Sequence, residues 1–108
     1  MTQAPGAITV RARIRLLTTA EGGRQTPVQG ETSYRPNHNF FGPDNRDMAV
    51  AYIDLPDGEG LALGETREIS LTFWPWERLN DEIRPGREWR IQEGGHLVGH
   101  GTVIEVLG

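Results

Sequence analysis

The sequence predicts an all-β fold, a six-stranded antiparallel closed barrel. The first observation behind this is the alternation of hydrophobic and polar side chains along several segments. The second is the spread of 14 glycines and 7 prolines along the chain, which is typical of many turns. The third is that no segment keeps a helical period for long. Closing the sheet removes the exposed edges that a sheet of this size must otherwise protect.

The clearest strand signal lies in residues 7–18. Apolar side chains occupy every second position there, namely Ile8, Val10, Ala12, Ile14 and Leu16. Arg11, Arg13 and Arg15 take alternating positions, so we expect one face in the core and the other in water. Next along the chain, Glu21-Gly22-Gly23-Arg24 predicts a turn, because glycine adopts positive φ at low cost.

The middle of the chain predicts one long connection and two strands. Residues 25–39 are polar and contain two prolines, so we expect a long loop or an edge excursion that leads to a short strand at residues 40–41. Residues 49–55 read as the next strand, which Pro56-Asp57-Gly58 ends.

The last third of the chain predicts three more strands, over residues 68–74, 87–92 and 97–107. Pro75 stops the first of them by removing a ladder donor, and some helical character follows in residues 76–83. Gly99 and Gly101 share one face of the final strand. Their spacing predicts a bend or a close backbone approach at a barrel corner.

Length and composition set the broad class of protein. We expect one domain over residues 1–108, with residues 1–6 flexible. No apolar run reaches the length of a membrane helix and the N-terminus lacks the pattern of a signal peptide, so we expect no membrane partner and a cytoplasmic location. The net charge of −4 disfavours non-specific binding to nucleic acid.

The residue types present argue against catalysis, so we expect no enzyme and no cofactor. The chain has no cysteine, no lysine to complete a phosphate-binding loop and no metal-binding HExxH motif. Of the three histidines, His96 and His100 lie four residues apart on a strand, which is about 13 Å and too far for one metal ion. We expect His38, His96 and His100 to be solvated or hydrogen-bonded, with no metal site.

Two features are candidates for a binding surface. Trp74-Pro75-Trp76 follows a strand end, where the rings either cap the open end of the barrel or contact a partner. The row Arg11, Arg13 and Arg15 either tracks phosphates or forms a solvated face paired with acidic residues on a neighbouring strand.

The turn motifs, in their order and spacing, resemble the C-terminal (third) domain of elongation factor Tu. The resemblance covers nearly the whole chain and rests on Glu21-Gly22-Gly23-Arg24, Thr26-Pro27, Tyr34-Arg35-Pro36, Leu55-Pro56, Glu93-Gly94-Gly95, Val98-Gly99 and Gly101. It implies a six-stranded antiparallel barrel. In that family the domain is not catalytic. It packs on the GTPase domain, contacts the T-stem backbone of aminoacyl-tRNA and helps form the surface for the exchange factor.

The match also shows departures from the family pattern. Gly94 matches a family position near the tRNA backbone, whereas His96 stands in place of arginine and Trp74 in place of lysine or another polar residue. Asn37 and His38 replace the family's Gln-Phe, and Ser33 replaces its glycine. Positive charge is therefore reduced near the face that binds tRNA in the family.

These observations predict a free-standing, non-catalytic binding module with a protein partner, which mimics the domain it resembles. The alternative is binding to the backbone of tRNA, related to translation elongation. Both expectations draw on the same candidate surface, which comprises Arg11, Arg13, Arg15, Arg24, Asn37, Trp74, Trp76, Gly94 and His96.

Overall fold

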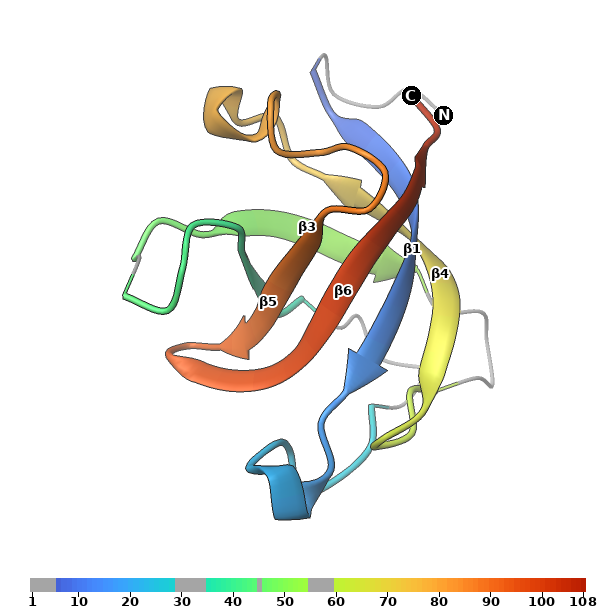
Figure 1. The fold of residues 1–108 in the computed structure, drawn as a ribbon, viewed down its shortest axis with the longest axis vertical. Coiled ribbons are helices and arrows are strands. Elements are labelled where there is room, and N and C mark those ends of the chain that lie inside the picture. The colour runs from blue at the N-terminus through green and yellow to red at the C-terminus, as the bar shows by residue number, and fades with distance from the viewer. Residues whose placement is uncertain (1–5, 29–34, 45, 55–59) are drawn as a thin grey trace.

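The computed structural model describes residues 6–28, 35–44, 46–54 and 60–108. The strands in this part of the chain are β1 (Ile8–Leu16), β2 (Asn37–Asn39), β3 (Ala49–Asp54), β4 (Thr66–Phe73), β5 (Glu88–Glu93) and β6 (His96–Val106) (Figure 1). Two short 3-10 helices, η1 (Thr19–Glu21) and η2 (Glu77–Leu79), lie in the connections.

The strands close into one barrel in the order β1-β4-β3-β2-β5-β6, and every neighbouring pair is antiparallel. The predicted fold class is therefore confirmed. All strands except β2 match their predicted ranges, with ends that differ by at most two residues. The expected helical character after Pro75 amounts to the single turn η2.

The inward positions of the alternating strands form the core. Val10, Ala12, Ile14 and Leu16 of β1 are fully buried, as the period-two pattern predicted. At the β2 end of the barrel the core becomes aromatic. Phe40 stacks on Trp89 with ring centroids 5.2 Å apart, and Phe73 meets both rings edge-on. Such offset and edge-on pairs are favourable arrangements of aromatic quadrupoles.

The two glycines of β6 make room for neighbouring segments, and the predicted close backbone approach is confirmed at Gly99, whereas Gly101 faces a side chain. A Cβ at position 101 would lie 2.4 Å from the indole of Trp89, and one at position 99 would lie 2.7 Å from the carbonyl oxygen of Arg15. Only glycine fits at these two points, because any side chain would displace the core ring or the β1 backbone.

The short strand predicted at residues 40–41 was wrong, because the ladder forms earlier, at Asn37–Asn39. The Asn39 side chain ends it: its Oδ1 accepts a hydrogen bond from the Phe41 backbone N–H at 2.9 Å and turns the chain. Asn39 and His38 are nevertheless buried, although the polar sequence Asn37-His38-Asn39 does not indicate burial. Elsewhere in residues 25–39, Val28 forms an isolated bridge with Leu61.

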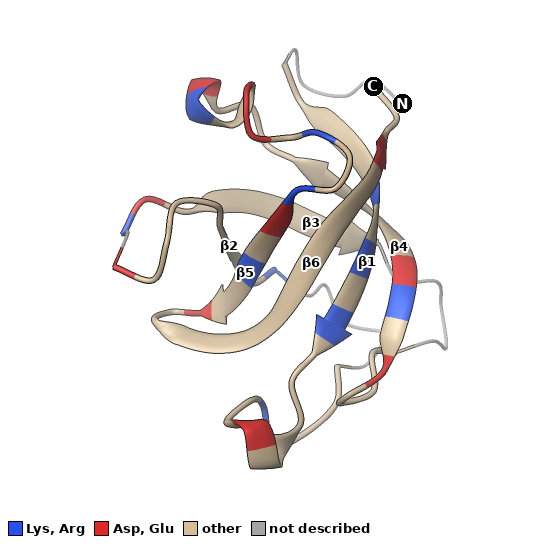
Figure 2. Ribbon diagram, viewed as in Figure 1, with Lys and Arg blue, Asp and Glu red and all other residues tan. Residues whose placement is uncertain are grey.

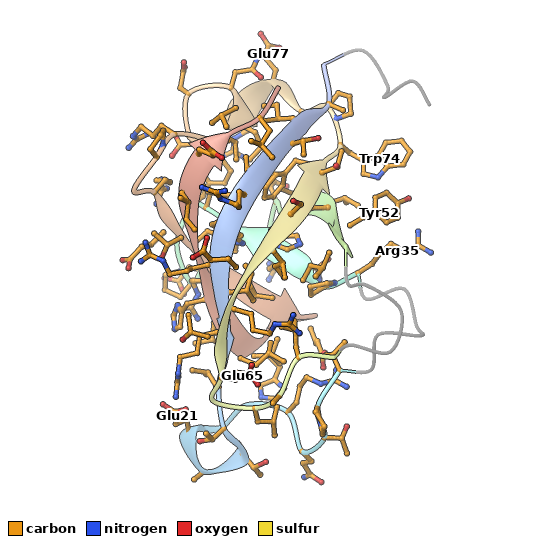
Figure 3. All side chains as sticks on the ribbon, turned by 90° about the vertical axis from the view of Figure 1, so that its right-hand side faces the viewer. Glu21, Arg35, Tyr52, Glu65, Trp74 and Glu77 are labelled. Carbon is orange, nitrogen blue, oxygen red and sulfur yellow. The ribbon has the colours of Figure 1, made fainter. Side chains whose placement is uncertain are left out.

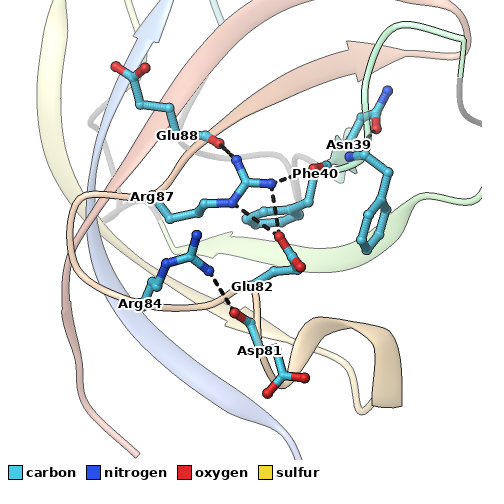
Figure 4. A network of polar contacts seen from close by, with 8 residues as sticks. Asn39, Phe40, Asp81, Glu82, Arg84, Arg87 and Glu88 are labelled. Carbon is cyan, nitrogen blue, oxygen red and sulfur yellow. Dashed lines mark hydrogen bonds and ion pairs between the residues drawn. The ribbon is translucent and has the colours of Figure 1, made fainter.

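The connection between η2 and β5 is tied to the barrel by Arg87 (Figure 4). Its guanidinium forms an ion pair with Glu82 at 2.9 Å and donates to the backbone carbonyls of Phe40 and Glu88. This set of contacts fixes the chain end that leads into β5 next to the end of β2.

Several expectations fall outside the described residues. Of the segment 1–6, expected to be flexible, only Gly6 is described, and the turn at Pro56-Asp57-Gly58 lies in the range 55–59. Ser33 and Tyr34 of the family resemblance also lie outside it.

Candidate functional site

Arg11, Arg13 and Arg15, the arginine face, lie on the outer side of β1 between two strands that carry acidic residues (Figure 2). Arg11 reaches Glu105 of β6 at 3.2 Å and Glu68 of β4 at 3.7 Å. These pairs are exposed, so they add little stability, but they neutralise the charge that Arg11 would offer to a phosphate.

Arg15 is engaged at the end of the same strand. It forms an ion pair with Glu21 at 2.9 Å, and Glu21 also accepts from the backbone N–H of Thr18 in a capping box that starts η1. The Arg15 hydrogen bond, followed by that of the Thr18 backbone, lowers the pKa of Glu21 to about 2. Arg13 alone of the three makes no ion pair within the described residues. The face thus fits a solvated, charge-paired surface.

The two Glu-Gly-Gly turns of the sequence lie against each other. Arg24, after the first turn, forms an ion pair with Glu93, which begins the second. In return, His96, after the second turn, donates from Nε2–H to the carbonyl oxygen of Gly22. The fold therefore brings together Arg24 and His96, two predicted site residues that are 72 positions apart.

Two further predicted residues, Asn37 and Gly94, share the wall of an open pocket of about 530 Å³. The pocket lies between the connection that follows β2 and the turn from β5 to β6, and it is lined by Asn37, Pro43, Asp44, Arg46, Met48, Gln92, Gly94 and Gly95. Beside it, Asn39 Nδ2 donates to Gln92 Oε1 at 2.9 Å, and both side chains are buried. The bond to Asn39 holds Gln92, which lines the pocket, in a fixed position.

Trp74 belongs to a different region, the aromatic patch, which we define as Arg35, Val50, Tyr52 and Trp74. Tyr52 and Trp74 lie side by side on the outside of the barrel, with ring centroids 6.0 Å apart and planes inclined by 45° (Figure 3). The backbone N–H of Trp74 donates to Val50 at 2.8 Å and places the indole next to β3. Trp74 is 49% exposed, Val50 48% and Tyr52 38%.

Arg35 forms the charged edge of the aromatic patch. Its guanidinium lies over the Tyr52 ring at 5.2 Å and donates to the phenol oxygen at 3.4 Å. A cation over an aromatic face is favourable and restrains both side chains. The patch therefore combines exposed rings with one positioned charge.

The structure separates the two tryptophans that flank Pro75. Trp76 is partly buried and packs against the core, where it meets Phe41 edge-on at 5.6 Å, and Arg78 lies over both rings. Trp76 therefore takes the capping role and Trp74 the exposed one. The sequence left capping and partner contact open for the pair. The packing of Trp76 fits a cap, and partner contact at the exposed Trp74 stays a prediction.

Arg35, Val50 and Tyr52 were not predicted from the sequence as site residues. A signal was present for two of them: with Ala51 and Ile53 directed into the core, the alternation places Val50 and Tyr52 outside, where two large apolar side chains are unusual. Arg35 left no such signal, because its place over Tyr52 depends on the route of the chain into β2.

The described residues hold no group of three or more His, Cys, Asp or Glu side chains placed to bind a metal ion. The same residues contain no helix that is both long enough and apolar enough to cross a membrane. No family model matches the chain.

Proposed function

We propose that this chain is a non-catalytic binding module that docks a protein partner through the aromatic patch. The observation that carries the proposal is the exposed pair Tyr52–Trp74, held at its edge by Arg35. Tryptophan, tyrosine and arginine are the residues that most often dominate binding energy at protein interfaces, and a fixed aromatic pair loses little entropy on docking.

The distribution of charge favours a protein over a nucleic acid as the partner. Binding a phosphate backbone requires several free cations, because each neutralised phosphate adds to affinity. In the arginine face, Arg11 and Arg15 form ion pairs with glutamates, and Arg24 is paired with Glu93. With a net charge of −4, the protein has little electrostatic attraction for RNA.

We also propose that the barrel is a relative of the C-terminal domain of elongation factor Tu and acts by mimicking it. The closed six-stranded antiparallel barrel is compatible with that relationship. Support comes from the paired Glu-Gly-Gly turns, which carry the resemblance in the sequence and lie against each other in the fold. Replacement of the family's polar residue by Trp74 supplies the patch with its most exposed ring.

The test is affinity capture from an extract of the source cells, treated with ribonuclease and quantified by mass spectrometry. The parent is compared with Trp74→Ser and with the matched control Arg13→Ser. The Arg13 side chain is exposed on β1, outside the aromatic patch, and makes no ion pair with a described residue. We expect at least a tenfold loss of a specific protein with Trp74→Ser and none with Arg13→Ser. Equal recovery by all three would count against the patch.

A second candidate, binding of the tRNA backbone, is favoured by one observation. Asn37 and Gly94 come together at the open polar pocket, and Arg46 lines the same wall. Binding of the tRNA backbone predicts that the protein retards tRNA in gels at low salt and that the retardation falls steeply as salt rises. Arg46→Ala is expected to reduce it. A tRNA that migrates unchanged at low salt removes it.

A further inference from the structure

His38 differs from the other two histidines in being completely buried, whereas His96 and His100 are exposed. It lies in the aromatic core on β2. Trp89 Nε1–H donates to its Nδ1 at 2.9 Å, so the proton of the neutral ring must sit on Nε2. Nε2 is buried and has no hydrogen-bond partner among the described residues. The ring is thus neutral with one unsatisfied N–H.

Among the described residues, none of those in contact with His38 carries a negative charge. Phe73 of β4 meets the ring edge-on at 5.4 Å, Trp89 of β5 lies at 6.1 Å, and Ala49 of β3 and Ile91 of β5 are its ladder partners. Arg87 and Glu82, charged groups at this end of the barrel, pair with each other, and Arg87 contacts the neighbouring ring of Phe40 (Figure 4). Burial therefore lowers the pKa of His38 to about 3.

The strand that carries His38 is the shortest in the barrel. It meets β3 only at Asn37 and His38, whereas β1 is paired with β4 from Ile8 to Arg15. Pro36, directly before β2, cannot donate a ladder hydrogen bond. Counting its partners on β3 and β5 together, β2 has the fewest paired positions of the described strands, so the least pairing is lost when it opens locally.

We propose that protonation of His38 opens the barrel at β2 and so makes this end of the protein sensitive to pH. A protonated ring carries hydrogen on both nitrogens, so Nδ1 no longer accepts from Trp89 and the two donors face each other. The ring then gains by leaving the core for water, and β2 moves with it. The inference is independent of the proposed function.

The opening would reach both candidate surfaces. Arg35 of the aromatic patch lies three residues before His38, and Asn37 of the pocket directly precedes it. Displacing β2 therefore removes Arg35 from the Tyr52 ring and rebuilds one wall of the pocket. The closed form, with both surfaces intact, is the form present at neutral pH.

The test is amide hydrogen exchange by NMR at pH 7 and pH 5, corrected for the intrinsic pH dependence of exchange. An ordinary histidine pKa of 6.5 in the open form and about 3 in the closed form predict an opening constant about 25-fold larger at pH 5. We expect this increase in the amides of β2, with the β1–β6 ladder unchanged. Equal β2 protection at both pH values would overturn the proposal, as would a joint loss of protection in β2 and β1.

The matched variants are His38→Gln and His96→Gln. Glutamine at position 38 accepts from Trp89 but does not titrate, so the pH dependence disappears, whereas the exposed His96→Gln leaves it intact. If His38→Gln fails to fold, the ring nitrogens of the parent decide the question. A His38 ring protonated on Nε2 and neutral at pH 5 in the closed state supports the proposal. A closed-state titration near pH 6.5 overturns it.

Discussion

The outside of the barrel presents two contrasting surfaces. The arginine face lies on β1, and the aromatic patch combines residues of β3 with Trp74 just after β4 and Arg35 just before β2. The arginine face is conspicuous in the sequence, but the fold pairs Arg11 and Arg15 with glutamates. The aromatic patch is inconspicuous in the sequence, but the fold assembles it with its rings exposed. Arg15 finds its glutamate nearby in the sequence, but those of Arg11 lie across the sheet, so a charged row along one strand says little about binding until its neighbours across the sheet are known.

The strand order explains the contrast. Glu105 reaches Arg11 because β6 pairs with β1, although the two residues stand at opposite ends of the chain. The register of β3 and β4 likewise brings Tyr52 next to Trp74. Both outcomes depend on long-range pairing, which local sequence patterns do not encode.

The largest expected effect is the difference between the two tryptophans in their contribution to the free energy of unfolding. Trp76→Ala removes a ring that packs against the core, so we expect a loss of about 2–3 kcal/mol in the free energy of unfolding. Trp74→Ala removes an exposed ring and is expected to cost less than about 0.5 kcal/mol. Urea denaturation followed by circular dichroism measures both, and equal losses would contradict the assignment of capping to Trp76.

The next effect concerns the edge of the aromatic patch. Arg35→Ala leaves both rings in place but removes the charge over Tyr52. We expect partner affinity to fall by about three- to tenfold, in line with a loss of roughly 1 kcal/mol for an exposed cation–π contact. Titration of the captured partner by calorimetry gives the ratio of affinities, and Arg13→Ala serves as the control on the arginine face.

A smaller effect is expected at the arginine face. Arg11→Ala breaks two exposed ion pairs, so unfolding free energy should change by less than about 1 kcal/mol, and less still at high salt. Denaturation at low and at molar salt checks this. A loss of several kcal/mol would mean that the face is structural rather than a solvated surface.

The smallest expected effect concerns the titration of the Glu21 carboxyl group, which contacts Arg15. Because the folded pKa of Glu21 is depressed, its contact with Arg15 is present above the ordinary glutamate pKa of 4.5 and is lost as pH falls through about 2. Carbon-detected NMR of the carboxyl group follows it directly. An ordinary titration near pH 4.5 would show that Arg15 is free in solution.

The sequence predicted the individual strands well because their determinants are local. The alternation in β1 and the glycines of the turns each depend on their own segment of the chain. β2 was not predicted because its polar residues are buried through hydrogen bonds to distant partners. Asn39 donates to Gln92, and Trp89 donates to His38. Periodicity cannot find a strand whose burial depends on hydrogen bonds to another strand.

The candidate site was only partly predicted, because long-range pairing also decides which of its residues meet. Asn37 and Gly94 were named from the sequence and meet at one pocket, and Trp74 was named and is exposed. Tyr52 and Arg35 were missed, because only the register of β3 and the route into β2 bring them to Trp74.

Photo-crosslinking tests the central claim most directly, since it probes the two surfaces in one experiment. A photoreactive phenylalanine analogue replaces Tyr52 in the aromatic patch or, in a second protein, Arg13 on the arginine face. Each protein is irradiated in source-cell extract, and adducts are identified by mass spectrometry. The account predicts a protein adduct from position 52 that disappears when Trp74→Ser is added, and none from position 13. A protein or RNA adduct formed at position 13, with none at position 52, would contradict it.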